Sequence, residues 1–113
     1  MKLMVLILNR TERLDMLLEG FSSAGISGAT IIESSGLAQT LNRIGSSLLT
    51  TAIKDILGAA AEDDNRTVLS VIKDEQLDTA RKVIYATVGD LSLPNTGVLF
   101  TVPIDFAEGI PKI

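Results

Sequence analysis

Four short apolar runs divide the chain, and each has the length of a β-strand. They are Leu3–Leu8, Ala29–Glu33, Thr67–Ile72 and Val98–Val102. Short runs rich in Val, Ile and Thr are typical of strands. Apolar residues occupy odd and even positions in all four, whereas an antiparallel sheet with helices on one side normally reads polar on the other. Because 113 residues cannot supply two layers of helix, the pattern predicts that other subunits cover the second face.

The segment between the first two runs has helical periodicity. We expect a helix over Arg10–Ala24, with Asn9 as its N-cap and Glu12 completing a capping box. Gly25 is the expected end of this helix. Its buried stripe, at spacings of three and four residues, consists of Leu14, Leu17, Leu18 and Phe21.

A second helix is predicted before the last run. It spans about Glu75–Val88, with Asp74 as its N-cap and Gly89 at its C-terminal end. Its buried stripe consists of Leu77, Ala80, Ile84 and Val88. The loop that follows contains Pro94 and Gly97, which indicate a structured turn rather than a linker.

Two strand–helix–strand halves in succession predict a single α+β domain over residues 1–113. The pattern is the ferredoxin-like βαββαβ arrangement with an antiparallel sheet. The anomaly is a long insert, about residues 37–64, because most strand-to-strand connections are far shorter. Within it, Ser47–Ala61 reads as an amphipathic helix whose apolar face includes Leu48, Leu49, Ile53 and Ile56. Two interpretations of that face stay open, namely docking onto a partner protein and packing within an oligomer.

Composition removes several classes of function. The net charge is −4 and no basic cluster is longer than a dipeptide, which argues against nucleic-acid binding. The chain has no Cys and no His, so it lacks thiolate chemistry, disulfides and the usual general base, and we expect a protein that is not an enzyme. The acidic run at residues 62–64 reads as a solvated helix end, because it has no spaced partner ligand, and we expect no metal site.

The first apolar run could be mistaken for part of a signal peptide, because Lys2 precedes it. It is too short for a secretory apolar region of about 7–15 residues, so we interpret it as a buried strand. No uninterrupted apolar stretch approaches the ~20 residues of a membrane span. We therefore expect no membrane insertion and a cytoplasmic location.

The order and spacing of several residues resemble the nitrogen-regulatory PII family. The first half shares the strand opening Met1-Lys2-Leu3, the pair Leu14-Asp15, the run Ala24-Gly25-Ile26-Ser27-Gly28, and then Thr30, Glu33 and Gly36. The second half shares Gly89-Asp90 and the run Thr96-Gly97-Val98-Leu99-Phe100-Thr101-Val102. The resemblance covers about residues 1–40 and 66–108. It implies a homotrimer whose sheets line a central barrel.

The resemblance also implies a function and a site. In the PII family, adenine nucleotides bind in clefts between subunits, and a long loop docks onto partner enzymes or membrane transporters. The position of that loop, the T-loop, corresponds to the insert at residues 37–64. The implied ligand-binding residues are Gly36, Gln39 and Thr40 on one wall of the cleft and Gly89, Asp90, Thr96 and Gly97 on the other.

Three departures separate this chain from the family pattern. Val98 stands where family members usually carry a lysine that meets phosphates, and Gly109 and Pro111 stand where they carry two arginines. The only tyrosine is Tyr85, on the second predicted helix rather than in the long loop. Charge-assisted hydrogen bonds are roughly twice as strong as neutral ones, so the absence of the lysine and the two arginines weakens triphosphate binding. The chain reads as a divergent PII-like protein with its ligand changed or lost.

Two functional hypotheses follow. The first is a signal-transduction trimer that senses a small metabolite, an adenine nucleotide being the candidate cofactor, and regulates a partner through its long loop. The second is a structural or interaction trimer in which the insert is an assembly element and the glycines of both walls only turn the chain. A metal-tolerance protein of the CutA type shares the scaffold, and the absence of His and Cys disfavours it.

Overall fold

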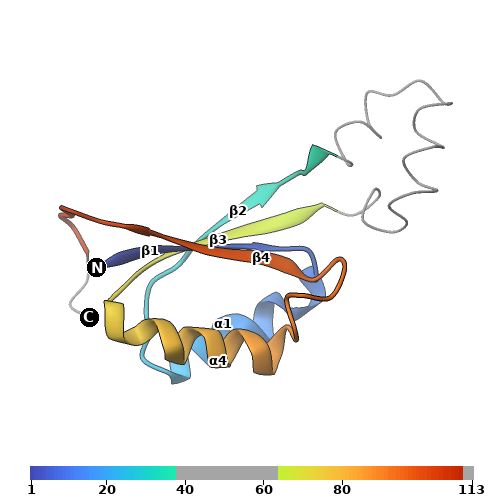
Figure 1. The fold of residues 1–113 in the computed structure, drawn as a ribbon, viewed down its shortest axis with the longest axis horizontal. Coiled ribbons are helices and arrows are strands. Elements are labelled where there is room, and N and C mark those ends of the chain that lie inside the picture. Colours follow the sequence, from blue (N-terminus) through green and yellow to red (C-terminus); the bar gives the residue numbers. More distant parts are fainter. Residues whose placement is uncertain (38–63, 111–113) are drawn as a thin grey trace, which may run out of the picture.

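The structure, a computed structural model, describes residues 1–37 and 64–110. Its strands are β1 (Lys2–Leu8), β2 (Thr30–Ser34), β3 (Asn65–Ile72) and β4 (Gly97–Pro103), and its helices are α1 (Leu14–Ser23) and α4 (Leu77–Thr87). The strands form one antiparallel sheet in the order β2-β3-β1-β4. Figure 1 shows α1 and α4 together on one face of that sheet. The predicted α+β class is confirmed, and this topology is compatible with a ferredoxin-like fold.

The two central strands fix the register of the sheet. β1 pairs with β3 from Lys2 opposite Ile72 to Leu8 opposite Arg66. The same β1 residues pair with β4, so that Leu8 lies opposite Gly97. All four predicted strands are present, with ends that differ by at most two residues from those of the apolar runs.

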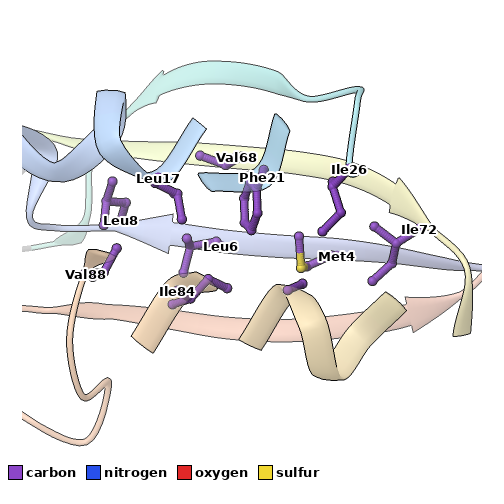
Figure 2. Packing of buried hydrophobic residues seen from close by; sticks show 11 residues of the cluster. Met4, Leu6, Leu8, Leu17, Phe21, Ile26, Val68, Ile72, Ile84 and Val88 are labelled. Carbon is purple, nitrogen blue, oxygen red and sulfur yellow. The ribbon is translucent and has the colours of Figure 1, made fainter. Parts of the chain in front are cut away.

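The core lies between the sheet and the two helices. Met4, Leu6 and Leu8 of β1 point toward the helices and are fully buried, as Figure 2 shows. The predicted helical stripes supply the other side of this core. Their buried members are Leu17 and Phe21 of α1, Ala80 and Ile84 of α4, and Val88 just after α4. Leu14 and Leu77 pack against the cluster and remain half-buried. Aliphatic side chains thus provide nearly all of the core, as the composition indicates.

The predicted N-cap of the first helix is wrong. The helical segment opens with a 3₁₀ turn, η1 (Thr11–Arg13), whose N-cap is Arg10 and which has no side-chain cap. The Asn9 backbone N–H instead donates to the carbonyl of Thr96 at 3.1 Å. This bond uses the N–H that a capping box would direct to Glu12, so the turn before β4 fixes the backbone at Asn9 and the predicted capping box does not form there.

The predicted N-cap of the second helix is also wrong, by one residue. A 3₁₀ turn, η3 (Asp74–Gln76), precedes α4, and Lys73 is its N-cap. The Lys73 N–H donates to Oε1 of Gln76 at 2.8 Å, which is the returning half of a capping box. Asp74 is engaged elsewhere, because its carboxylate accepts a hydrogen bond from the N-terminal amino group at 3.1 Å.

The predicted helix ends are confirmed. Gly25 has φ of +85° just after α1, and Gly89 has φ of +106° after α4. Both angles lie in the left-handed region that glycine adopts without strain. The next N–H after Gly25, that of Ile26, closes the helix end by donating to the carbonyl of Phe21 at 2.9 Å.

The second face of the sheet is apolar, and no helix covers it within the described ranges. Because Met4, Leu6 and Leu8 face the helices, alternation and register place a set of side chains on the opposite face, which we call the open face. Its apolar members are Leu3, Val5, Ile7, Ile32, Leu69, Val71, Val98, Phe100 and Val102. Val98, Phe100 and Val102 are 55%, 46% and 44% exposed. The prediction that both faces of the sheet are apolar is confirmed for these strands.

Among residues 1–37 and 64–110, no helix has the length and apolar character needed to cross a membrane. The predicted insert helix at Ser47–Ala61 lies outside the described residues, and so do Leu48, Leu49, Ile53 and Ile56.

Candidate functional site

The turn between α4 and β4 is tied to the junction between β1 and α1. The carbonyl of Thr96 accepts hydrogen bonds from the N–H groups of Asn9, at 3.1 Å, and Arg10, at 3.4 Å. Nη1 of Arg10 donates to the carbonyl of Val88 at 2.9 Å. A cation at this place neutralises the negative end of the α4 dipole and satisfies one of its orphan carbonyls. Two segments far apart in sequence are thereby held together at one end of the sheet.

The glycines of this turn have structural roles. The Gly89 N–H donates to the carbonyls of Ile84 and Tyr85, at 3.2 and 3.1 Å, so it closes α4. A Cβ at Gly97 would lie 2.8 Å from the carbonyl oxygen of Ile7, closer than real Cβ contacts come. Gly97 therefore lets β4 approach β1. Their predicted roles in ligand binding stay predictions.

Asp90 organises the exposed part of the turn. Its Oδ1 accepts hydrogen bonds from the backbone N–H of Ser92 at 2.9 Å and from the Ser92 hydroxyl at 2.7 Å. Both bonds favour the ionised form, so the backbone bond first and the hydroxyl bond second hold the pKa of Asp90 below its ordinary value. Asp90 thus presents a carboxylate at the surface with one oxygen already engaged.

The other predicted wall lies only partly within the described residues. Gly36 follows the end of β2, whereas Gln39 and Thr40 lie outside the described ranges. The base of the insert carries a polar cluster on the open-face side of β2 and β3. In it, the Ser34 hydroxyl contacts Oδ1 of Asn65 and lies 2.9 Å from the hydroxyl of Thr67.

Sequence reasoning missed this polar cluster. Asn65 is buried although it lies next to the insert, and the members of the cluster come from two strands, Ser34 from β2 and Asn65 and Thr67 from β3. Every buried side-chain nitrogen or oxygen in the described ranges has a hydrogen-bond partner. The cluster is therefore self-satisfied, and the polar residues that flank both ends of the insert were the available signal for it.

Among the described residues, Gly36 of the first predicted wall and Gly97 of the second lie on different edges of the sheet. Glu33 lies opposite Arg66, Arg66 opposite Leu8, and Leu8 opposite Gly97, so these four residues form one row across the sheet. The row ends at β2 on one edge and at β4 on the other. Three inter-strand spacings separate the edges by roughly 14 Å. Gly97 and the end of β2, which Gly36 follows, therefore lie at the same end of the sheet and on opposite edges.

A cleft of about 510 Å³ lies beside the second predicted wall, between α4, the turn that follows it and β4, and the predicted site residues Gly89 and Asp90 are among its lining residues. One flank of α4 contributes Asp78, Arg81, Lys82 and Tyr85, and the apolar lining comes from Ile84, Leu91 and Leu99. Arg81-Lys82 is a basic dipeptide, which is too short a cluster to indicate nucleic-acid binding. Helical spacing of 78, 81, 82 and 85 was the available signal for a shared surface.

No protein-family model matches this sequence, and no curated protein matches it.

Proposed function

We propose that the chain is one subunit of a homotrimeric, PII-like signal-transduction protein without catalytic activity. Its subunits pack through their open faces and bind a small metabolite in the clefts between them. Residues 37–64 present a surface to a partner protein, either an enzyme or a membrane transporter. The observation that carries the proposal is the apolar open face of β1, β3 and β4.

The open face favours burial by association. Val98, Phe100 and Val102 are each about half exposed in the single chain. Complete burial of such side chains is worth ~1.5–3 kcal/mol each, so covering the exposed half adds ~1 kcal/mol per residue. Contiguous exposed apolar patches on soluble proteins commonly mark interaction sites. A trimer gains this contribution three times, once for each subunit.

The positions of the two walls support a cleft between subunits. Gly36 and Gly97 lie at the same end of the sheet on opposite edges, so the β2 edge of one chain can face the β4 edge of the next. Binding there would couple ligand to assembly and to the insert, which begins directly after Gly36. A ligand shifts the insert only through different affinities for its two states.

The residues at the second wall favour a ligand other than a triphosphate. Val98 offers no charge, and the nearby Arg10 guanidinium is engaged with the carbonyl of Val88. An adenine nucleotide with fewer phosphates, recognised through its base, fits this chemistry better than ATP.

The alternative, a structural trimer with empty clefts, also has an observation in its favour. The Gly89 N–H and the Thr96 carbonyl are both used within the chain, which leaves fewer backbone groups for a ligand. In that case the open face still drives assembly, and the insert acts as an interaction element.

Calorimetric titration with ATP, ADP, AMP and cyclic AMP, each with and without Mg²⁺ and 2-oxoglutarate, tests the sensing function. Sedimentation equilibrium on the same samples measures the oligomeric state. We expect a trimer that binds about one nucleotide per subunit. A Phe100→Lys variant places a charge on each open face and should lose both the trimer and the binding. A trimer that binds no nucleotide at millimolar concentration supports the structural alternative, and a monomer refutes both.

A further inference from the structure

The cleft beside α4 has exposed charged side chains on its rim and an apolar lining. Its volume of about 510 Å³ falls within the range of ordinary binding sites. Arg81 and Lys82 are exposed on the rim, and neither forms an ion pair with any residue in the described ranges. Leu91 and Leu99 line the interior. Two carboxylates, those of Asp78 and Asp90, also line the cleft, and one oxygen of Asp90 already accepts hydrogen bonds from Ser92. An occupant that fills the apolar lining and carries acidic groups must therefore place those groups beside Arg81 and Lys82.

The segment after β4 has this combination. It reads Asp105-Phe106-Ala107-Glu108, and both carboxylates are exposed. The Phe106 side chain is 75% exposed, so its own chain offers it almost no burial. A phenylalanine in water between two acids is costly for one subunit, because aromatic burial is among the largest apolar contributions available.

The segment of the same chain turns away from its own cleft. It leaves β4 at Pro103, and the N–H of Ile104 donates to the carbonyl of Met1 at 3.2 Å. Ile110 then lines a second cavity, of about 450 Å³, with residues that include Leu3, Thr30 and Val71. Those residues belong to β1, β2 and β3, whereas the α4 cleft lies beside β4, at the opposite edge of the sheet from β2.

We propose that the segment Asp105–Glu108 of a second copy of this chain occupies the α4 cleft. Phe106 packs against Leu91 and Leu99, and the two carboxylates meet Arg81 and Lys82 on the rim. An aromatic anchor in a pocket supplies most of the affinity of such contacts, and complementary charge fixes its orientation. The contact is head-to-tail, so three copies can close into a ring in which each cleft holds the segment of the next chain. In its ring form the inference rests on the proposed trimer.

Tyr85 gives a direct measurement of occupancy. It lines the cleft, it is 68% exposed in the single chain, and it is the only tyrosine in a protein without tryptophan. Quenching of its fluorescence by neutral acrylamide therefore reports on the cleft alone. Sedimentation velocity on the same samples gives the oligomeric state independently.

Phe106→Ala in the full chain is the first variant. We expect Tyr85 to be protected in the wild-type oligomer and quenched in the variant to the extent typical of the free, 68% exposed side chain. Loss of a hot-spot anchor weakens association by about 30-fold. Met16→Ala is the matched control, because Met16 is an exposed apolar residue on α1, away from the cleft, and it should change neither quantity.

Charge reversal tests the rim. Arg81→Glu with Lys82→Glu should unprotect Tyr85, and adding Asp105→Lys with Glu108→Lys on the same chain should restore protection. An oligomer in which Tyr85 quenching ignores Phe106→Ala overturns this inference and leaves the proposed trimer intact. A chain that stays monomeric at all concentrations with Tyr85 exposed overturns both. Failure of the fourfold variant to recover, while the wild type is protected, overturns the assigned charge pairing.

Discussion

The two faces of the sheet offer a matched pair of substitutions, Phe21→Ala and Phe100→Ala. Phe21 is 2% exposed between the sheet and the helices, whereas Phe100 is 46% exposed on the open face. The same truncation therefore removes the same atoms from two different environments. Its effect on each side of the sheet separates the stability of the subunit from the stability of the assembly.

The two substitutions should affect two different free energies, that of unfolding the subunit and that of associating the subunits. Phe21→Ala leaves a cavity in the core and should lower the free energy of unfolding by about 3–5 kcal/mol, a large part of the 5–15 kcal/mol that typical domains possess. Phe100→Ala leaves no enclosed cavity in a single subunit, and it should cost ~1 kcal/mol there. If three open faces pack together, Phe100→Ala also removes three contacts per trimer, and that loss appears in association.

Urea unfolding at several protein concentrations distinguishes these effects, because unfolding of an obligate oligomer depends on concentration. Phe21→Ala should lower the midpoint at every concentration while the concentration dependence persists. Phe100→Ala should lower the midpoint most at concentrations where the wild type is a trimer, and least at low concentration, where both proteins are dissociated subunits. If both proteins unfold with concentration-independent midpoints that differ only by the ~1 kcal/mol expected for a single subunit, the open face is not an interface and the expectation is refuted.

Three further substitutions test the turn that joins α4 to β4, each followed by urea or acid unfolding. Gly97→Ala should destabilise the protein by ~1–3 kcal/mol, because its Cβ would overlap a backbone carbonyl of β1. Arg10→Ala should lower the free energy of unfolding by about 1 kcal/mol, because the hydrogen bond that caps α4 is lost. Arg13→Ala is the control and should change it very little, because the Arg13 guanidinium hydrogen-bonds to a methionine sulfur at the surface. Equal losses of stability in the two variants would refute the capping role of Arg10. Asp90→Asn should flatten the acid limb of stability, and Ser92→Ala should do the same. The folded pKa of Asp90 lies below its unfolded value, so its contribution is complete above the unfolded pKa and disappears as pH falls through the folded pKa; an unchanged acid limb would contradict this.

Local signals in the sequence predicted the elements of this fold. Strands of five to eight residues, two amphipathic helices and the glycines after them appear where hydrophobic period and left-handed backbone preference indicate. The helix residues that face the sheet were also predictable, because the stripes of Leu17 with Phe21 and of Ile84 with Val88 follow helical spacing. These features depend on residues within a few positions of one another.

The N-terminal ends of the helices were not predictable in this way. Asn9 and Asp74 have the chemistry of N-caps, yet Asn9 bonds to Thr96 and Asp74 to the N-terminal amino group. Their partners lie about 70 or more positions away in the sequence. A capping rule considers a single turn of chain, so it cannot register such competition.

The distinction between local signals and long-range contacts also applies to the candidate site. The sequence by itself determined which residues could form the walls of a cleft, and it determined that both faces of the sheet are apolar. Only the tertiary structure decided that the walls lie on opposite edges of one sheet, that Arg10 is engaged with α4, and that Arg81, Lys82 and Tyr85 border a cleft. The physical reason is that periodicity records the face on which a side chain lies, whereas strand order and long-range hydrogen bonds decide which faces and edges meet.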